Sequence, residues 1–466
     1  MLMLRPAFAV ALIWLAVVAT RTARADDEEA PIKITLHPAA VSQPALKHRL
    51  LPQVKDRMPG NAAVYYGKVK SEQNKLFGDR PLWEKIYAWT EMPIEELRRE
   101  KPELNIDTPI YYLEQGAMCD SCDWQLPIRR EPFYSILLPE IQEARSLARL
   151  LIVKARLAIA AGDFDAALEH LQTSYALARN VAHGETLING LVGLAIAGVK
   201  ATQIRDLVQQ PGAPNLFWTL TELPDPLIDF RAGIEAEVGA IEMAIPELKD
   251  LESDDRTPEQ WQATLQKLWK MVHAFSDKPE WQQSPAYLMA MAVKNYPAAK
   301  QGLIDRGMAA EAVERMSVAQ VILIDALHLH HQVSDDVSPW FYVPWPQGKA
   351  GMSAAYQRAD AIYTAQRETI PLSQLFMPGL QACRQAQVRT QRDHAALRVL
   401  EALRIYGAAH EGRLPELLSE IADLPVPHDP VTGEPFVYRR EGDGAVLESL
   451  GLSASPLRYE IQMVRP

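Results

Sequence analysis

The 466-residue sequence contains only three cysteines, Cys119, Cys122 and Cys383. Exported proteins that depend on disulfides carry many more, so side-chain packing must supply the stability of this chain. Asp120 and Asp123 lie beside the pair Cys119 and Cys122 and oppose thiolate formation, which disfavours a redox-active dithiol. The pair is therefore a candidate for a short structural disulfide or for two inert thiols.

Basic runs are also absent, since 48 lysines and arginines are scattered among 59 acidic residues and the net charge is −11. Such a protein is poorly suited to binding nucleic acid or anionic lipid. Arg5, an apolar run over 7–19 and the small-residue site Ala23-Arg24-Ala25 predict a signal peptide over 1–25, with an uncleaved anchor as the alternative. Its removal leaves 45 basic residues against 59 acidic ones, a net charge of −14. We expect an exported protein, periplasmic or extracellular, with no membrane span after cleavage.

Recognisable catalytic motifs are missing as well. The sequence contains no Gly-x-Ser-x-Gly elbow, no Walker-type phosphate loop, no dinucleotide fingerprint and no His-Glu-x-x-His zinc motif. These absences remove the commonest hydrolase, nucleotide-binding and metalloprotease signatures. They favour a non-catalytic protein without a cofactor.

The clearest feature that is present is a helical hairpin over residues 155–182. Gly162, a natural helix terminator, and Asp163, a good N-cap, separate two segments whose apolar residues recur every three and four positions. The middle of the following segment, 185–212, is apolar on every face and carries three glycines, which predicts a buried helix closely approached by its neighbours. We interpret its apolar part as too short to span a bilayer.

Changes in periodicity divide the rest of the chain. Scattered prolines predict an extended, poorly ordered arm over 26–80, followed by a helical repeat-like domain over 81–337. Three prolines and four aromatic residues predict a loop and linker helix over 338–379. The region 380–466 is predicted as a long helix plus a three-stranded antiparallel sheet, because apolar and polar residues alternate near its end.

The segment LAIAAGDFDAALEHLQTSYAL resembles a tetratricopeptide repeat (TPR) in its Gly-Asp-Phe-Asp turn and in Ala167, which lets the two helices approach closely. Only one copy is present, so an extended array is not expected. The predicted fold is mainly α: a TPR-like helical-hairpin bundle or short solenoid with a small C-terminal cap of one helix and an antiparallel β-sheet.

The chain resembles a group of large exported bacterial proteins without an assigned activity. Four sequence blocks, found in order, carry this resemblance: CDWQLP, the helical hairpin with its flanking residues, WFYVPWPQ, and the region from ALRVLEALRIYG to GEPFVYR. The last block is also similar to the helix-plus-sheet part of type II secretion pseudopilins. The residues that carry this similarity are Pro427, Asp429, Pro430, Gly433, Pro435 and Phe436. Pseudopilins join that part directly to a hydrophobic assembly helix. Here a long helical region intervenes, so assembly into a pilus is not expected.

Two clusters carry candidate sites. Asp325, His328 and His331 share one face of a predicted helix and are candidate metal ligands, although histidines near a helix C-terminus are favourable without a metal. The second cluster, a candidate stacking platform for a sugar or an anchor for a partner, consists of Trp340, Phe341, Tyr342 and Trp345. Burial in the core is the simpler interpretation of these aromatic side chains.

The leading functional hypothesis is a non-catalytic scaffold or binding protein that engages another envelope protein or a peptide through a helical surface. The alternative is a cell-envelope hydrolase or glycan-binding protein that uses the aromatic loop together with Asp325 and His328. The two hypotheses differ in which residues must lie together in the folded chain.

Overall fold

The computed structural model describes residues 31–128, 138–252, 256–273, 280–365, 369–370, 372–452 and 456–465. The predicted signal peptide, residues 1–25, lies outside these ranges. The chain forms two compact units, each assembled from separate stretches of sequence. Among the described residues, we call 31–125, 138–233 and 383–465 the mixed unit, because it contains the larger sheet, and 126–128 and 234–382 the helical unit. Each unit is thus discontinuous in sequence.

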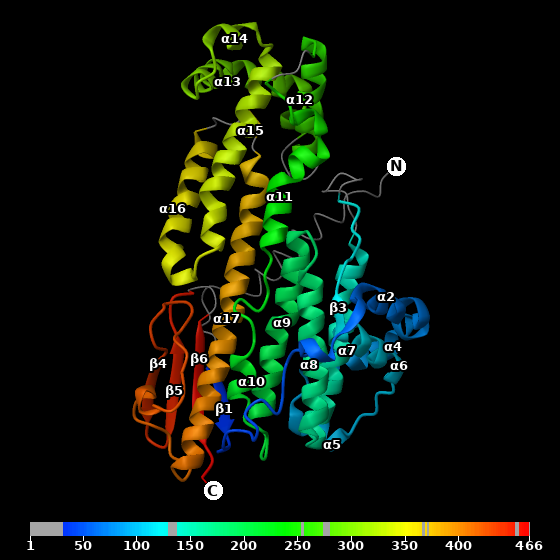
Figure 1. Cartoon of the computed structure of the whole chain (residues 1–466), viewed down its shortest axis with the longest axis vertical. Coiled ribbons are helices and arrows are strands. Elements are labelled where there is room, and N and C mark those ends of the chain that lie inside the picture. Colours follow the sequence, from blue (N-terminus) through cyan, green and yellow to red (C-terminus); the bar gives the residue numbers. More distant parts are fainter. Residues whose placement is uncertain are drawn as a thin grey trace. The chain divides into compact units, whose positions relative to one another are not determined.

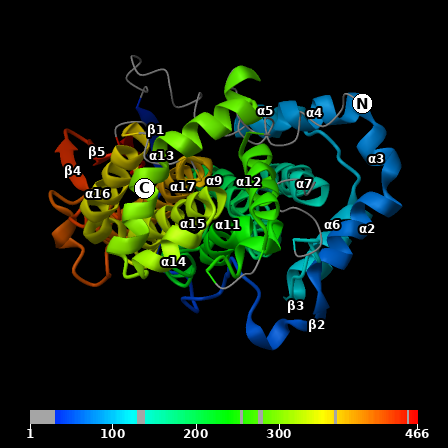
Figure 2. The same ribbon diagram turned by 90° about the horizontal axis from the view of Figure 1, so that it is seen from above.

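The mixed unit is built around the predicted hairpin, which the structure confirms. Helix α7 (Pro139–Ala161) ends at Gly162, whose φ of +79° is left-handed, and α8 (Phe164–Ala182) begins after Asp163, whose side chain accepts a hydrogen bond from the Ala166 amide at 3.0 Å. Because the turn is this tight, α7 and α8 lie against each other, and further helices surround them (Figures 1 and 2). The helices that contact the hairpin are α2 (Ala62–Glu72), α4 (Arg80–Glu91), α5 (Ile94–Glu100), α6 (Asp107–Met118) and α9 (Leu187–Val208). The mixed unit also contains α3 (Asn74–Gly78) and α10 (Phe217–Thr221).

Helix α9 packs closely on α8, as the glycines predict. A Cβ atom at Gly193 would lie 2.7 Å from the Ala178 carbonyl oxygen, so only glycine allows this approach. The helix has 22 residues and is long and apolar enough to cross a membrane, so the interpretation that it is too short is wrong. Because 67% of its most apolar window is buried inside the protein, packing in a core accounts for its composition.

A four-stranded sheet completes the mixed unit, with the order β1-β6-β5-β4. Strands β4 (Val437–Glu441), β5 (Gly444–Ser449) and β6 (Leu457–Met463) are antiparallel neighbours, as predicted. The sheet is nevertheless mixed, because β1 (Ile32–Leu36) pairs parallel with β6. In the described part of the predicted arm, β1 buries its alternate residues, and α2 and α3 follow it.

A buried ion pair on α17 (Ser373–Ala409) binds the segment that follows β1. Arg404 and Glu401 on this helix are fully buried, and an Arg404 nitrogen lies 2.9 Å from a Glu401 oxygen. Arg404 also donates hydrogen bonds to the carbonyl groups of His37 at 2.9 Å and Ala213 at 2.7 Å. The Ala39 amide donates to the Arg404 carbonyl at 3.1 Å. The segments around His37 and Ala213, which lie far apart in sequence, are thus both hydrogen-bonded to α17.

In the helical unit α15 (Val318–Val337) packs against its neighbours α12, α13 and α16 (Figure 1). The other helices are α11 (Arg231–Ala244), α12 (Pro258–His273), α13 (Pro285–Asp305), α14 (Ala310–Arg315) and α16 (Trp345–Thr364). Helix α16 begins inside the predicted proline and aromatic loop. Its Pro346 lies in the first turn, where the missing amide hydrogen costs nothing, so these prolines start a helix instead of preventing one.

Candidate functional site

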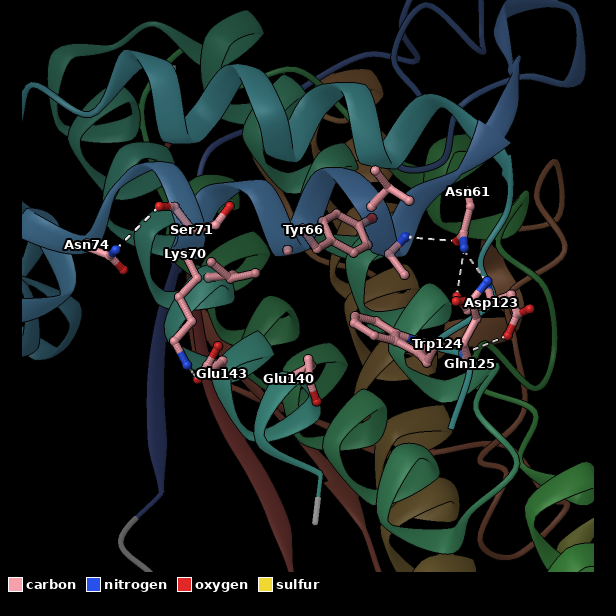
Figure 3. Close-up of a pocket in the computed structure, with 14 residues that line it drawn as sticks. Asn61, Tyr66, Lys70, Ser71, Asn74, Asp123, Trp124, Gln125, Glu140 and Glu143 are labelled. Carbon is pink, nitrogen blue, oxygen red and sulfur yellow. Dashed lines mark hydrogen bonds and ion pairs between the residues drawn. The ribbon is translucent and has the colours of Figure 1, made fainter. Parts of the chain in front are cut away.

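A cavity of about 460 Å³ lies in the mixed unit between α2, the segment 123–125 and the first turns of α7 (Figure 3). This volume is within the usual range of ligand sites, about 300–1,000 Å³. Its wall combines apolar, aromatic and charged side chains, among them Val64, Tyr66, Lys70, Asp123, Trp124, Glu140, Glu143 and Leu147.

The aromatic wall of the cavity is held by the hairpin helix α8. Trp124 stacks on Tyr66 with ring centroids 6.0 Å apart and an interplanar angle of 23°. The indole nitrogen of Trp124 donates to the Asn180 carbonyl, and the Asn180 amide nitrogen donates to the Tyr66 hydroxyl, both at 2.8 Å. Burial raises the pKa of Tyr66, so its hydroxyl stays neutral. Gly116 on α6 makes room for this ring, because a Cβ atom there would lie 2.4 Å from Tyr66 Cε1.

The side chain of Asn61 links the start of α2 to Asp123, and both border the cavity. Asn61 is the N-cap of α2, where its side-chain oxygen accepts from the Ala63 amide at 3.1 Å. The same oxygen accepts from the Asp123 amide at 2.9 Å, and its side-chain nitrogen donates to the Asp123 carbonyl at 2.8 Å. Strands β2 (Met58–Asn61) and β3 (Cys119–Ser121) pair just before this point. Segment 123–125 is therefore fixed against the start of α2.

The charged side of the cavity joins α2 to α7. Lys70 forms an ion pair with Glu143, and the two side chains are 51% and 28% exposed. Glu140 lies one turn earlier on α7, between Glu143 and Trp124 in the view of Figure 3. With Asp123, three carboxylates and one ammonium group line the cavity.

A second cavity, of about 470 Å³, lies between the segment 102–107 and the hairpin. It contains Lys154, which is 3.6 Å from Asp107, and His170. Burial lowers the pKa of His170 to about 4, so its imidazole is neutral at physiological pH. This cavity is more open than the first, and its described lining contains no phenylalanine, tyrosine or tryptophan. The second cavity therefore offers a ligand less enclosing surface than the first.

Cys119 and Cys122 are free thiols in this structure, which does not contain the candidate disulfide. Burial raises the pKa of both thiols, that of Cys122 to about 12. A thiol that stays protonated is a poor nucleophile and a poor metal ligand.

The candidate metal ligands do not form a site. An Arg306 nitrogen lies 2.7 Å from an Asp325 carboxylate oxygen, so the carboxylate is already occupied by a cation. His328 and His331 face two other acids, Glu252 at 3.7 Å and Glu242 at 3.5 Å. Among the described residues, no group of three histidine, cysteine or acidic side chains lies where it could hold a metal ion.

The four aromatic residues do not form one platform either. Phe341 is buried, and Trp340 lies so close to α16 that a Cβ atom at Gly351 would be 2.1 Å from its ring. Trp345 is partly buried, while Tyr342 is 53% exposed and donates to Glu235 at 2.9 Å. Asp325 lies twelve residues before the end of α15, about 18 Å along the helix. The two clusters therefore do not converge on a shared site.

Comparison of the chain with protein-family models, curated proteins and solved structures finds no match. The resemblances found in the sequence therefore stay predictions.

The residues of the α2–α7 cavity were missed in the sequence because they come from three segments without a shared motif. Asn61 before an apolar stretch is an N-cap signal that reveals the start of α2. No sequence signal reveals that Trp124 and Glu140 line the same cavity.

Proposed function

We propose that the protein is an exported, non-catalytic binding protein that holds a peptide segment of another envelope protein in the α2–α7 cavity. The cavity itself is the observation that supports this function. It combines an aromatic wall, which supplies contact area, with a few charged groups that give orientation, and this is the usual composition of a recognition site. The surrounding helices fix its aromatic wall in advance, which lowers the entropic cost of binding.

The position of the cavity also favours a peptide. It lies at the start of α7, the first helix of the TPR-like hairpin, and Val64 at its edge is 56% exposed. An extended segment can therefore place one or two side chains in the cavity while its backbone stays at the surface. Neither the metal candidates nor the aromatic loop offers a comparable site, so we propose no catalytic activity.

Site-specific photo-cross-linking tests this function. A benzophenone side chain replaces Val64, or Val293 on α13 as a control, because both positions are exposed. We expect the probe at position 64 to capture a discrete peptide segment, identified by mass spectrometry, that the probe at position 293 does not capture. A synthetic peptide of that sequence is then titrated against the mature chain.

Two glycine substitutions make the test specific to the cavity. A Cβ atom at Gly67, which lines the cavity, or at Gly198 on α9 meets no heavy atom within 4 Å. Gly67→Gln should therefore fill the cavity without disturbing the fold, and Gly198→Gln is its matched control. We expect Gly67→Gln to weaken binding at least tenfold and Gly198→Gln to leave it unchanged. Equal capture at both probe positions, or binding unaffected by Gly67→Gln, contradicts the proposal.

A further inference from the structure

Among the described residues that line the α2–α7 cavity, acidic side chains outnumber basic ones. Asp123, Glu140 and Glu143 contribute three carboxylates, and Lys70 contributes one ammonium group, held by Glu143 (Figure 3). We propose, building on the function above, that the bound peptide inserts a lysine or arginine side chain, whose cation replaces Lys70 at Glu143. Lys70 is then an internal competitor that sets the affinity.

The walls of the cavity fit such a side chain. A lysine or arginine has an apolar stem and a charged end, and it buries the stem while the charge stays near polar groups. Val64 and Leu147 supply apolar surface, and Trp124 supplies an aromatic face that attracts cations. Glu143 and Glu140, one turn apart on α7, supply the carboxylates for its charged end.

Because Lys70 is exposed, replacing it at Glu143 by a ligand cation costs little free energy. The Lys70 side chain is 51% exposed, and ion pairs between partly exposed groups contribute little to stability, because water solvates both partners. A ligand cation at Glu143 therefore displaces Lys70 into solvent at small cost. It gains the apolar and aromatic contacts in addition.

Two alternative interpretations lead to different results. Acidic residues in the first turn of a helix are favourable without any ligand, and this explains Glu140 and Glu143 as structural residues only. In addition, the N-terminal ends of α2 and α7 carry positive partial charge and, with Lys70, favour an anion. The first alternative predicts no preference for a charged ligand, and the second predicts a preference for an acidic one.

Three short peptides distinguish these cases. The mature full-length chain is titrated with the N-acetylated, C-amidated tripeptides Gly-Lys-Gly, Gly-norleucine-Gly and Gly-Glu-Gly, and dissociation constants are measured by NMR of the peptides. We expect the lysine peptide to bind about five-fold more tightly than the norleucine peptide, the upper range for an exposed ion pair. We also expect its affinity to fall as salt increases.

The variants follow the same reasoning. Lys70→Met removes the competitor and should strengthen binding of the lysine peptide about three- to five-fold, whereas Glu143→Gln should weaken it by a similar factor. Lys267→Met is the matched control, because Lys267 forms an ion pair of similar exposure with Glu247 at 3.0 Å in the helical unit. It should change nothing. Lys70→Gln replaces Lys70→Met if circular dichroism shows that the methionine variant is misfolded.

The outcomes separate this inference from the proposed function. If the lysine and norleucine peptides bind equally and Gly67→Gln abolishes both, the cavity is a peptide site, but the cation inference is wrong. Tighter binding of the glutamate peptide, no binding of any tripeptide, or no effect of Lys70→Met also overturns the inference. The proposed function itself fails only if cross-linking at position 64 captures no cavity-dependent segment.

Discussion

We expect the substitution Arg404→Met to destabilise the mixed unit by about 3–5 kcal/mol. Arg404 is fully buried and donates hydrogen bonds to Glu401 and to the carbonyl groups of His37, Ala213 and Pro214. Methionine fills a similar volume but leaves these four acceptors without their donor. The buried Glu401 carboxylate then keeps hydrogen bonds from the Asn215 side chain, at 2.6 Å, and from the Leu216 backbone amide, but it loses the positive charge of Arg404.

The size of the effect follows from the cost of a buried charge. Breaking a buried ion pair by removing one partner costs about 3–5 kcal/mol, because the other charge is left uncompensated. The three carbonyl groups add to this loss to the extent that water does not reach them. Since whole domains are stable by only about 5–15 kcal/mol, the variant should lose a large fraction of its stability.

Urea unfolding of the mature chain, followed by circular dichroism, measures this loss. Arg413→Met is the control, because Arg413 and Glu411 form an ion pair at 3.1 Å with side chains 72% and 83% exposed. The control should change stability by less than about 1 kcal/mol. Hydrogen exchange should also become faster in Arg404→Met near His37 and Ala39. A loss below about 1 kcal/mol in Arg404→Met refutes the reasoning.

Three further predictions concern the mixed unit. Gly193→Ala forces a Cβ atom within 2.7 Å of the Ala178 carbonyl oxygen and should cost about 1–3 kcal/mol in urea unfolding, whereas Gly198→Ala should be neutral or stabilising. The pKa of His170 is about 4 in the folded chain and about 6.5 in the unfolded chain, so stability should fall as pH drops from 6.5 to 4, and His170→Gln should reduce this fall. In the reduced protein, Cys122, with a pKa of about 12, should react with iodoacetamide at pH 8 about a thousand-fold more slowly than in urea. A thermal or chemical unfolding series tests the first two, and mass spectrometry tests the third.

The parts of the fold that were predicted correctly depend on local sequence. Gly162 and Asp163 end one helix and begin the next through groups within a few residues of each other, so the hairpin was predictable. The three C-terminal strands were predictable for the same reason, since alternation and turns are local. Strand β1 was missed although Ile32, Ile34 and Leu36 alternate with polar residues, which is a local strand signal. Its pairing was not predictable, because its partner β6 lies at the opposite end of the chain.

The candidate site was harder to predict because its geometry depends on contacts between distant segments. Asn180 on α8 fixes both Trp124 and Tyr66, and Gly116 on α6 allows the position of Tyr66. For Asp325 and His328 the sequence showed the spacing but not the partners of the side chains. Their spacing on one helix face was correct, but Arg306 and Glu252 from other elements occupy them. Spacing alone does not show which groups a side chain faces.

The central claim is that the cavity between α2 and α7 binds a peptide segment. Hydrogen exchange of the mature chain, with and without the synthetic peptide identified by cross-linking, tests it most directly. We predict slower exchange in residues 61–72 and 139–147 with the peptide, no change in α13, and loss of the effect in Gly67→Gln. Protection that lies elsewhere, or that persists in Gly67→Gln, would contradict the claim.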